Sequence, residues 1–325
     1  MSTATPVPET VDLDGDDARH TLRTTPTWPL VRDTIDRLRW ADGFSHARAT
    51  AFQVVLTIVP GMLVLVAVAS RLHWESLSSA IIRSIESIAP GEASQVFRDA
   101  FDRGSRAGAS SDWAAIAAGS VALLVSGTTA FGQVERSANR IYGVEADRPS
   151  TEKYVHGFVM MVSAGLFLGL YFGAIGLGSG WGPADDGAAH WWWAVGRWPL
   201  GALCLGVAIT VIFRASPRRR QPAWSWLVSG TLLAIAGVVL VSLLLSGYLA
   251  ASSSFGDTYG PLAGFLGLLL WSYLSCLAVY VGLAFAAQLE AVRAGLRETR
   301  SVEKIEAGEP DATVVSYAAA LRRST

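Results

Sequence analysis

Charged residues, cysteine and histidine are all scarce in this chain of 325 residues. The two cysteines, Cys204 and Cys276, lie inside apolar runs without a CxxC pair, which excludes a disulfide framework and a thiolate zinc site. The five histidines are scattered and show no metal-binding spacing. Charged residues make up 16% of the chain, against about a quarter in a soluble domain, and 51% of it is hydrophobic. This composition predicts an integral membrane protein.

Six long apolar runs account for that composition. An uncharged stretch of about 20 residues spans the hydrocarbon core as a helix. The six candidate spans are 49–71, 113–134, 155–180, 190–213, 223–249 and 259–289. The first run follows a polar leader rather than a cleavable signal peptide, so we expect it to remain as an anchor. The predicted fold class is an all-α integral membrane protein, a six-transmembrane-helix bundle.

Lysine and arginine are distributed unevenly between the two sides of such a bundle. Of the 26 basic residues, 20 fall in the N-terminal leader, the second and fourth loops and the C-terminal tail. Loops rich in Lys and Arg stay in the cytoplasm. We therefore expect both termini to be cytoplasmic, as an even number of spans requires.

The segments outside the spans differ in composition. Residues 1–27 are rich in Thr, Pro and Asp and predict a disordered N-terminal tail. Residues 28–48 combine arginines with apolar residues, which is typical of a short helix on the membrane surface. We expect the membrane domain to cover 28–293 and a cytoplasmic tail to cover 294–325.

The first outer loop, 72–112, carries two apolar stripes at helical spacing, separated by an "APGE" break. The stripes consist of Leu77, Ile81, Ile85 and Ile88, then Val96, Phe97, Ala100 and Phe101. They predict an extracytoplasmic amphipathic helical hairpin between spans 1 and 2. Such a hairpin covers the bundle or docks a substrate.

A polar segment closes the second span. At about 100° per residue, Glu135, Asn139 and Tyr142 share one helix face, which we expect to look into the bundle as a structural polar motif. Arg136 and Arg140 lie on the adjoining face.

Arg148 follows these arginines closely in the chain, just before a proline. Like charges four residues apart on a helix repel each other and need a compensating partner. Arg136, Arg140 and Arg148 are therefore candidate contacts for an anionic lipid or substrate. The alternative is that these arginines only anchor the span by reaching toward headgroups.

Two further groups of residues are candidates for structural polar motifs. In span 1, a proline inside the helix frees a backbone carbonyl, and a nearby threonine hydroxyl can satisfy local backbone. The residues at the start of span 6 are typical of a tight turn. The two groups are Gln53, Thr57 and Pro60, and Asp257, Tyr259 and Gly260.

Small residues recur at a spacing of four in the third span, as Gly165, Gly169 and Gly173. GxxxG faces allow helices to approach closely in lipid. We interpret this stripe as a packing face within the bundle.

Three segments together resemble the YihY/BrkB family. The first is "ATAFQVVLTIVPGMLVLVAVAS", the second "ERSANRIYGVEADRP" and the third "YGPLAGFLGLLLWSYL". The matched positions are Thr57, Pro60, Asn139, Arg140, Ile141, Tyr142, Arg148, Pro149, Tyr259, Gly260, Leu270, Trp271, Tyr273 and Leu274. One departure is Ala284, where the family commonly has a glutamate, unless Gln288 or Glu290 replaces that carboxylate.

The resemblance implies a bacterial inner-membrane protein of envelope maintenance that transports or translocates a lipid or other anionic amphipathic solute. The alternative is a non-transporting scaffold that binds envelope or division partners. A ribonuclease label attached to some members has no support here, because the chain lacks a His/Asp metal cluster and a basic aromatic face for RNA. We therefore expect membrane lipids as partners, with no enzyme activity, nucleic acid, metal or cofactor.

Overall fold

The computed structural model describes residues 4–10, 13–71, 93–110, 113–177, 188–251, 262–296 and 299. Over these residues the chain forms nine α-helices and no β-strand. Six of the helices are long and apolar enough to cross a membrane, which confirms the predicted fold class. They are α3 (Gly43–Arg71), α6 (Trp113–Tyr142), α7 (Ser150–Leu177), α8 (Ala188–Ala215), α9 (Trp224–Ala251) and α11 (Ala263–Arg293).

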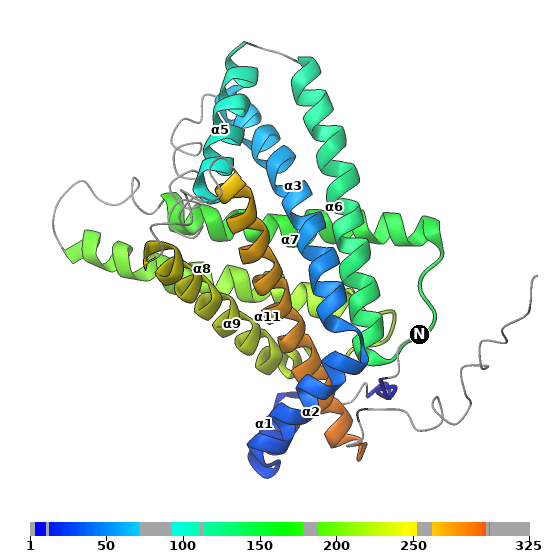
Figure 1. Ribbon diagram of the computed structural model, residues 1–325. Coiled ribbons are helices and arrows are strands. Elements are labelled where there is room, and N and C mark those ends of the chain that lie inside the picture. The colour runs from blue at the N-terminus through cyan, green and yellow to red at the C-terminus, as the bar shows by residue number, and fades with distance from the viewer. Residues whose placement is uncertain are drawn as a thin grey trace, which may run out of the picture.

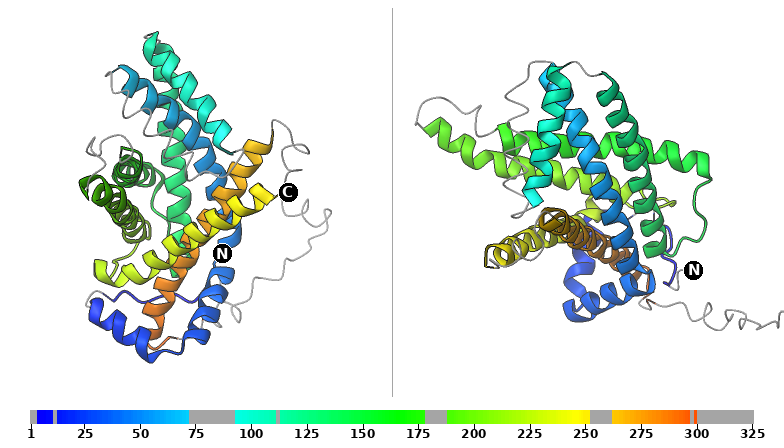
Figure 2. Two further views of the ribbon diagram at one scale, coloured as in Figure 1. Left: turned by 90° about the vertical axis from the view of Figure 1, so that its left-hand side faces the viewer. Right: turned by 45° about the horizontal axis from the view of Figure 1, so that its top comes forward.

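The six long helices form a closed ring of neighbours. The most extensive contacts join α3 with α6, α7 with α8, and α9 with α11, and further contacts link these pairs to one another. The pairs run in different directions: α7 and α8 cross the line of α3 and α6 in Figure 1 and are seen nearly end-on in the left view of Figure 2. Large apolar side chains such as Leu203 and Leu243 are more than 60% exposed on the outside of the ring. These exposed side chains suit a hydrocarbon surrounding, because lipid does not penalise them.

The outer loop contributes one described helix, α5 (Ala93–Ala109), which is the second of the two predicted amphipathic helices. It packs along α3 and also contacts α11. A Cβ added at Gly104 or Gly108 would lie 2.7 or 2.6 Å from a backbone carbonyl oxygen of α3, so these glycines permit the close approach. The first predicted helix, over residues 77–88, lies outside the described residues.

The spans α9 and α11 cross closely at two glycines. A Cβ added at Gly230 would lie 2.4 Å from the carbonyl oxygen of Gly282, and a Cβ at Gly282 would lie 2.4 Å from that of Gly230. By contrast, a Cβ at Gly165 or Gly169 would meet nothing within 4 Å. The prediction that Gly165 and Gly169 pack inside the bundle is wrong, because that face of α7 points away from the other helices.

These glycines allow a matched stability test. We expect Gly282→Ala to destabilise the protein by about 1–3 kcal/mol, because the added methyl group forces two backbones apart. Gly165→Ala should be neutral or slightly stabilising, because alanine is the better helix former by up to about 1 kcal/mol. Thermal unfolding of the two variants in detergent measures the difference. Equal melting temperatures would show that α9 and α11 are farther apart than described.

The N-terminal 27 residues differ from the predicted disordered tail. They contain α1 (Gly15–Thr24), and the side chain of Asp14 caps this helix by accepting from the backbone N–H groups of Asp16 and Asp17. Ahead of α1, Ala4 and Val7 are buried in the main core cluster. The prediction from composition is wrong here because the partners that order this segment lie far away in the chain.

The next helix, α2 (Thr27–Trp40), accounts for part of the predicted surface helix. Its outer face exposes Trp28, Val31 and Ile35. Its inner face buries Arg37 completely. The amphipathic pattern therefore predicted the position of this helix, but it did not predict that a charged residue lies on the buried side.

Candidate functional site

Charged and amide side chains gather at one end of the helix ring. There α2 meets the C-terminal ends of α6 and α11 and two connections, residues 143–149 between α6 and α7 and residues 216–223 between α8 and α9. This region, in the lower part of Figure 1, is called the polar end below. Because buried charges need partners, its contacts decide which residues can face a ligand.

Arg37 lies at the centre of the polar end and is fully buried. Its Nε donates to Oε1 of Gln288 at 2.7 Å, and its Nη1 donates to the carbonyl oxygens of Ile141 at 3.2 Å and Thr5 at 2.9 Å. Burial lowers the pKa of Arg37 to about 10, so the guanidinium group stays charged at neutral pH. One charged side chain thus joins α2, α6, α11 and the N-terminal segment.

A second buried arginine, Arg219, pairs with Glu290. Its Nη1 and Nη2 donate to the two carboxylate oxygens at 3.0 and 2.7 Å, and the two side chains are 2% and 0% exposed. The guanidinium carbon of Arg219 lies 4.6 Å from the ring centroid of Tyr142, and the Thr10 hydroxyl donates to Glu290. Glu290 therefore holds the connection 216–223 against the end of α11.

The Arg219–Glu290 pair predicts a large effect of a single truncation. We expect Glu290→Ala to destabilise the protein by about 3–5 kcal/mol, because it leaves Arg219 buried without its counter-charge. Equilibrium unfolding in mixed micelles measures the loss. The control is Asp99→Ala in the exposed pair with Arg103 on α5, which should cost less than about 1 kcal/mol. Similar losses in the two variants would contradict burial of Glu290.

The polar face predicted at the end of α6 is buried. Glu135, Asn139 and Tyr142 are at most 1% exposed. Nη1 of Arg148 lies 3.0 Å from Oε1 of Glu135 and donates to the carbonyl oxygen of Ser216 at 3.2 Å. The contact with Glu135 is an ion pair without the alignment of a hydrogen bond. Arg148 thus ties α6 to the end of α8.

Asn139 fastens both connections at once. Its Nδ2 donates to Oδ1 of Asp147 at 3.0 Å, and its Oδ1 accepts from the backbone N–H of Arg218 at 2.7 Å. Nη1 of Arg218 in turn donates to the carbonyl oxygen of Asp147 at 2.8 Å. Burial acts to raise the pKa of Asp147, but the hydrogen bond from Asn139 and the charges of Lys153 and Arg136 outweigh it and lower that pKa. Asp147 is therefore ionised at neutral pH.

A cavity of about 440 Å³ lies between α6 and the start of α7. Three cations, Arg136, Arg148 and Lys153, line it together with one carboxylate, Asp147. Oδ2 of Asp147 is 3.6 Å from Nζ of Lys153 and 3.9 Å from Nε of Arg136. The remaining wall is mostly hydroxyl and amide, from Thr128, Thr129, Gln133, Ser150 and Tyr154, with Gly132. Since Glu135 already neutralises Arg148, the lining retains one unmatched positive charge.

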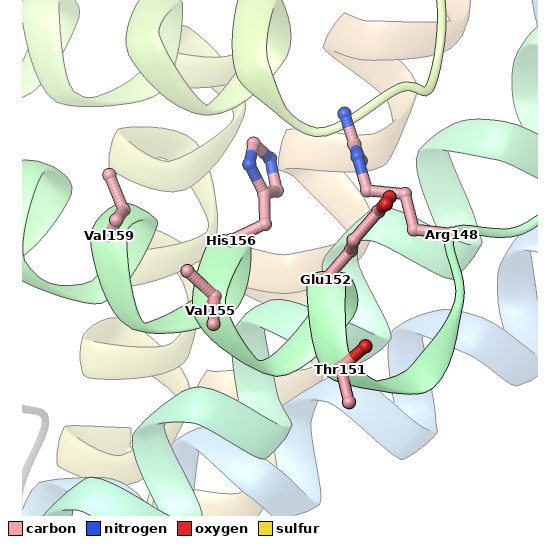
Figure 3. A pocket seen from close by; sticks show the side chains of 6 residues that line it. All are labelled: Arg148, Thr151, Glu152, Val155, His156 and Val159. Atoms are coloured by element: carbon pink, nitrogen blue, oxygen red, sulfur yellow. The ribbon is translucent and has the colours of Figure 1, made fainter.

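A shallower hollow of about 530 Å³ lies on the opposite face of α7. Figure 3 shows Arg148 and His156 pointing to the same side of α7, toward the end of α8. Nε2 of His156 lies 2.9 Å from the carbonyl oxygen of Ala215. Val155 and Val159 make the wall largely apolar. Arg148 and His156 are thus engaged with backbone carbonyls here, and the cavity between α6 and α7 offers the better site for an anion.

The three candidate arginines occupy different positions. Arg136 is half-exposed and Arg148 is mostly buried, and both line the cavity. Arg140 is partly buried and is not among the lining residues. Sequence reasoning missed Lys153 and Asp147, although both lie within six residues of Arg148.

The other predicted motifs lie away from the polar end or outside the description. Thr57 donates to the carbonyl oxygen of Gln53 at 2.8 Å, one turn before Pro60 inside α3. Asp257, Tyr259 and Gly260 lie outside the described residues. Ala284 is fully buried in the main core cluster. Within the described ranges, no three His, Cys, Asp or Glu side chains group closely enough to hold a metal.

The fold and the polar end define a helical, multi-span membrane protein. The family model described as virulence factor BrkB matches residues 34–306, so the chain belongs to the BrkB family. Arg37, Arg219, Glu290 and the residues that line the cavity fall inside this match, whereas the N-terminal segment and α1 precede it.

Known relatives are similar at low identity. A ribonuclease-like protein, YfkH, of Bacillus subtilis (strain 168) is 23% identical over 262 residues, which cover 78% of this chain and 92% of YfkH. The UPF0761 membrane protein Smlt0865 of Stenotrophomonas maltophilia (strain K279a) is 29% identical over 54% of this chain and 42% of its own length. The UPF0761 membrane protein XAC0937 of Xanthomonas axonopodis pv. citri (strain 306) is 27% identical with the same coverage. The chain thus spans less than half the length of these UPF0761 relatives. No solved structure matches it.

Proposed function

We propose that this protein transports or translocates a lipid or another anionic amphipathic solute in maintenance of the bacterial envelope, and that the cavity between α6 and α7 receives the anionic group. The unmatched positive charge of that cavity carries the proposal. Lys153 is 16% exposed and Arg136 is 50% exposed, so one cation is shielded from water and the other is accessible. A phosphate or carboxylate between them gains more attraction than at an open surface, because the local dielectric is lower.

The surface of α7 supports an amphipathic rather than a purely polar solute. Tyr154 lines the cavity, and Phe158 and Val162 follow it at intervals of four residues. All three are more than 40% exposed. Gly165 and Gly169 continue this face of α7 with open space above them. A headgroup in the cavity therefore places its acyl chain along an exposed apolar track.

The position of the described chain ends supports the proposed orientation. The backbone N–H of Thr5 donates to the carbonyl oxygen of Thr299 at 3.1 Å, so both ends of the described chain meet at the polar end. The excess of arginine on this side supports a cytoplasmic location for it in the plasma membrane. The cavity then lies at the level of the inner leaflet headgroups.

A non-enzymatic role accords with the chemistry of the cavity. Its lining combines cations, one carboxylate, hydroxyl and amide groups, but no cysteine or histidine. The hydroxyl of Thr129 is hydrogen-bonded to the carbonyl oxygen of Val125 rather than to a base. The lining suits binding of an anionic headgroup better than nucleophilic catalysis.

Lipid retention tests the proposed site. We expect Arg136→Ala/Lys153→Ala to lose at least about 80% of the co-purified anionic lipid, because removal of two cations leaves Asp147 to repel the headgroup. Quantitative mass spectrometry of lipids from detergent-purified protein measures the loss. The control Arg103→Ala removes an exposed arginine from α5 and should retain the wild-type amount. Equal retention in all three proteins would refute the cavity as the lipid site.

The acidic residue of the cavity predicts an effect in the opposite direction. Asp147 accepts a hydrogen bond from Asn139 and forms ion pairs with Lys153 and Arg136. It therefore competes with an incoming anion for these two cations. Asp147→Asn keeps an acceptor for Asn139 but removes the negative charge. We expect this variant to retain about two- to tenfold more anionic lipid, by the same mass spectrometry, because the attraction for an anion rises. A lower amount would show that Asp147 assists binding.

A further inference from the structure

Residues 4–10 form an extended segment across the polar end, called the N-terminal strap below. Only Ala4 and Val7 of the strap are buried, while Pro6, Pro8 and Glu9 are exposed. Most of its contacts are polar and reach residues far away in the chain. The strap lies before the residues matched by the family model, yet the residues that bind it lie inside that match.

The strap fastens the connection between α6 and α7. The backbone N–H of Val7 donates to the carbonyl oxygen of Tyr142 at 3.0 Å. Gly143, with φ of 71°, follows directly, and a Cβ there would lie 2.7 Å from Cα of Pro6. A positive φ and this close approach both require glycine. The first residue of the connection is therefore shaped to receive the strap.

The strap also fastens the connection between α8 and α9. The carbonyl oxygen of Pro8 accepts from Nη2 of Arg219 at 2.8 Å. Oε1 of Glu9 accepts from the backbone N–H of Arg220 at 3.1 Å. The Thr10 hydroxyl then donates to Glu290, the carboxylate that pairs with Arg219.

These two connections hold the charges of the cavity. Asp147 and Arg148 belong to the first connection. The second connection supplies Ser216, whose carbonyl oxygen accepts from Arg148, and Arg218, which donates to the carbonyl oxygen of Asp147. A displacement of either connection therefore moves charged residues that line the cavity.

We propose that the N-terminal strap is a releasable clasp on the cavity between α6 and α7. In place, it holds both connections and so keeps Asp147 and Arg148 in position. When it is released, both connections loosen and the cavity opens wider to an anionic group. Release exposes little apolar surface, because the strap buries only the side chains of Ala4 and Val7. It breaks six hydrogen bonds, including those from Arg37 and Arg219, so its cost is mainly polar. The effect of release on binding of an anionic group rests on the proposed function. The effect of the strap on the positions of the two connections does not.

Hydrogen–deuterium exchange of the full-length protein in detergent, without added ligand, tests this coupling. Val7→Asn places an amide in the apolar contact of the strap, and Glu9→Ala/Thr10→Ala removes the side-chain contacts of the strap with Arg220 and Glu290. We expect the amides of residues 143–149 and 216–223 to exchange about tenfold faster in both variants. The matched control is Pro8→Asn, which adds the same amide at an exposed position and keeps the carbonyl group that Arg219 binds.

Unchanged exchange at the two connections, in either strap variant, overturns the clasp. Faster exchange in Pro8→Asn to the same degree also overturns it, because the effect would not depend on the strap contacts. The exchange experiment does not depend on lipid. If Arg136→Ala/Lys153→Ala retains the wild-type amount of lipid, the proposed ligand site is refuted but the clasp is not. In the same way, unchanged exchange refutes the clasp and leaves the ligand site standing.

Discussion

The burial of two guanidinium groups at one end of the helix ring is the constraint on which the polar end depends. Arg37 and Arg219 are shielded from water, so every donor they carry needs an acceptor from the protein. The chain supplies Gln288 and Glu290 from α11 and carbonyl groups from α6 and the N-terminal strap. Because these acceptors come from three elements, α6, α11 and the N-terminal strap, binding of the two arginines fixes how these elements meet, although Nη2 of Arg37 and Nε of Arg219 find no hydrogen-bond partner among the described residues.

The same constraint explains why the helix pairs can diverge elsewhere. Helices in lipid gain no hydrophobic driving force for association, so close packing and polar contacts hold them together. Here the polar contacts concentrate at one end, and the Gly230–Gly282 crossing fixes α9 against α11. Away from these two points, α7 and α8 run across the line of α3 and α6 (Figure 2), while an apolar cluster that includes Val66, Ala100 and Leu268 still joins α3, α5 and α11. Polar contacts thus hold one end of the bundle, and close apolar packing holds the rest.

The six spans and the buried face of Glu135, Asn139 and Tyr142 could be predicted because each depends on the local chain. Lipid forces long apolar runs to be helices, and helical periodicity then places residues three or four apart on one face. The roles of Arg37 and Glu290 could not be predicted in this way, because Arg37 meets Gln288 across 251 residues of sequence and Glu290 meets Thr10 across 280. No local pattern marks such pairs. The placement of residues 4–10 and 13–24 was missed for the same reason, since composition describes a segment without its partners.

The candidate site shows how a structural and a binding role divide between neighbouring arginines. Arg148 is matched by Glu135 and by the carbonyl group of Ser216, so its charge mostly serves to join α6 and α8. Arg136 has only the distant carboxylate of Asp147, 3.9 Å away, among its ion pairs in the described part of the chain, and that carboxylate is shared with Lys153 and Asn139. One carboxylate shared by two cations satisfies neither fully. Under the proposed function, the anchoring and ligand-binding interpretations of the arginine cluster therefore apply to different residues: Arg148 is the anchor, and Arg136 and Lys153 are the cations that would attract an anion.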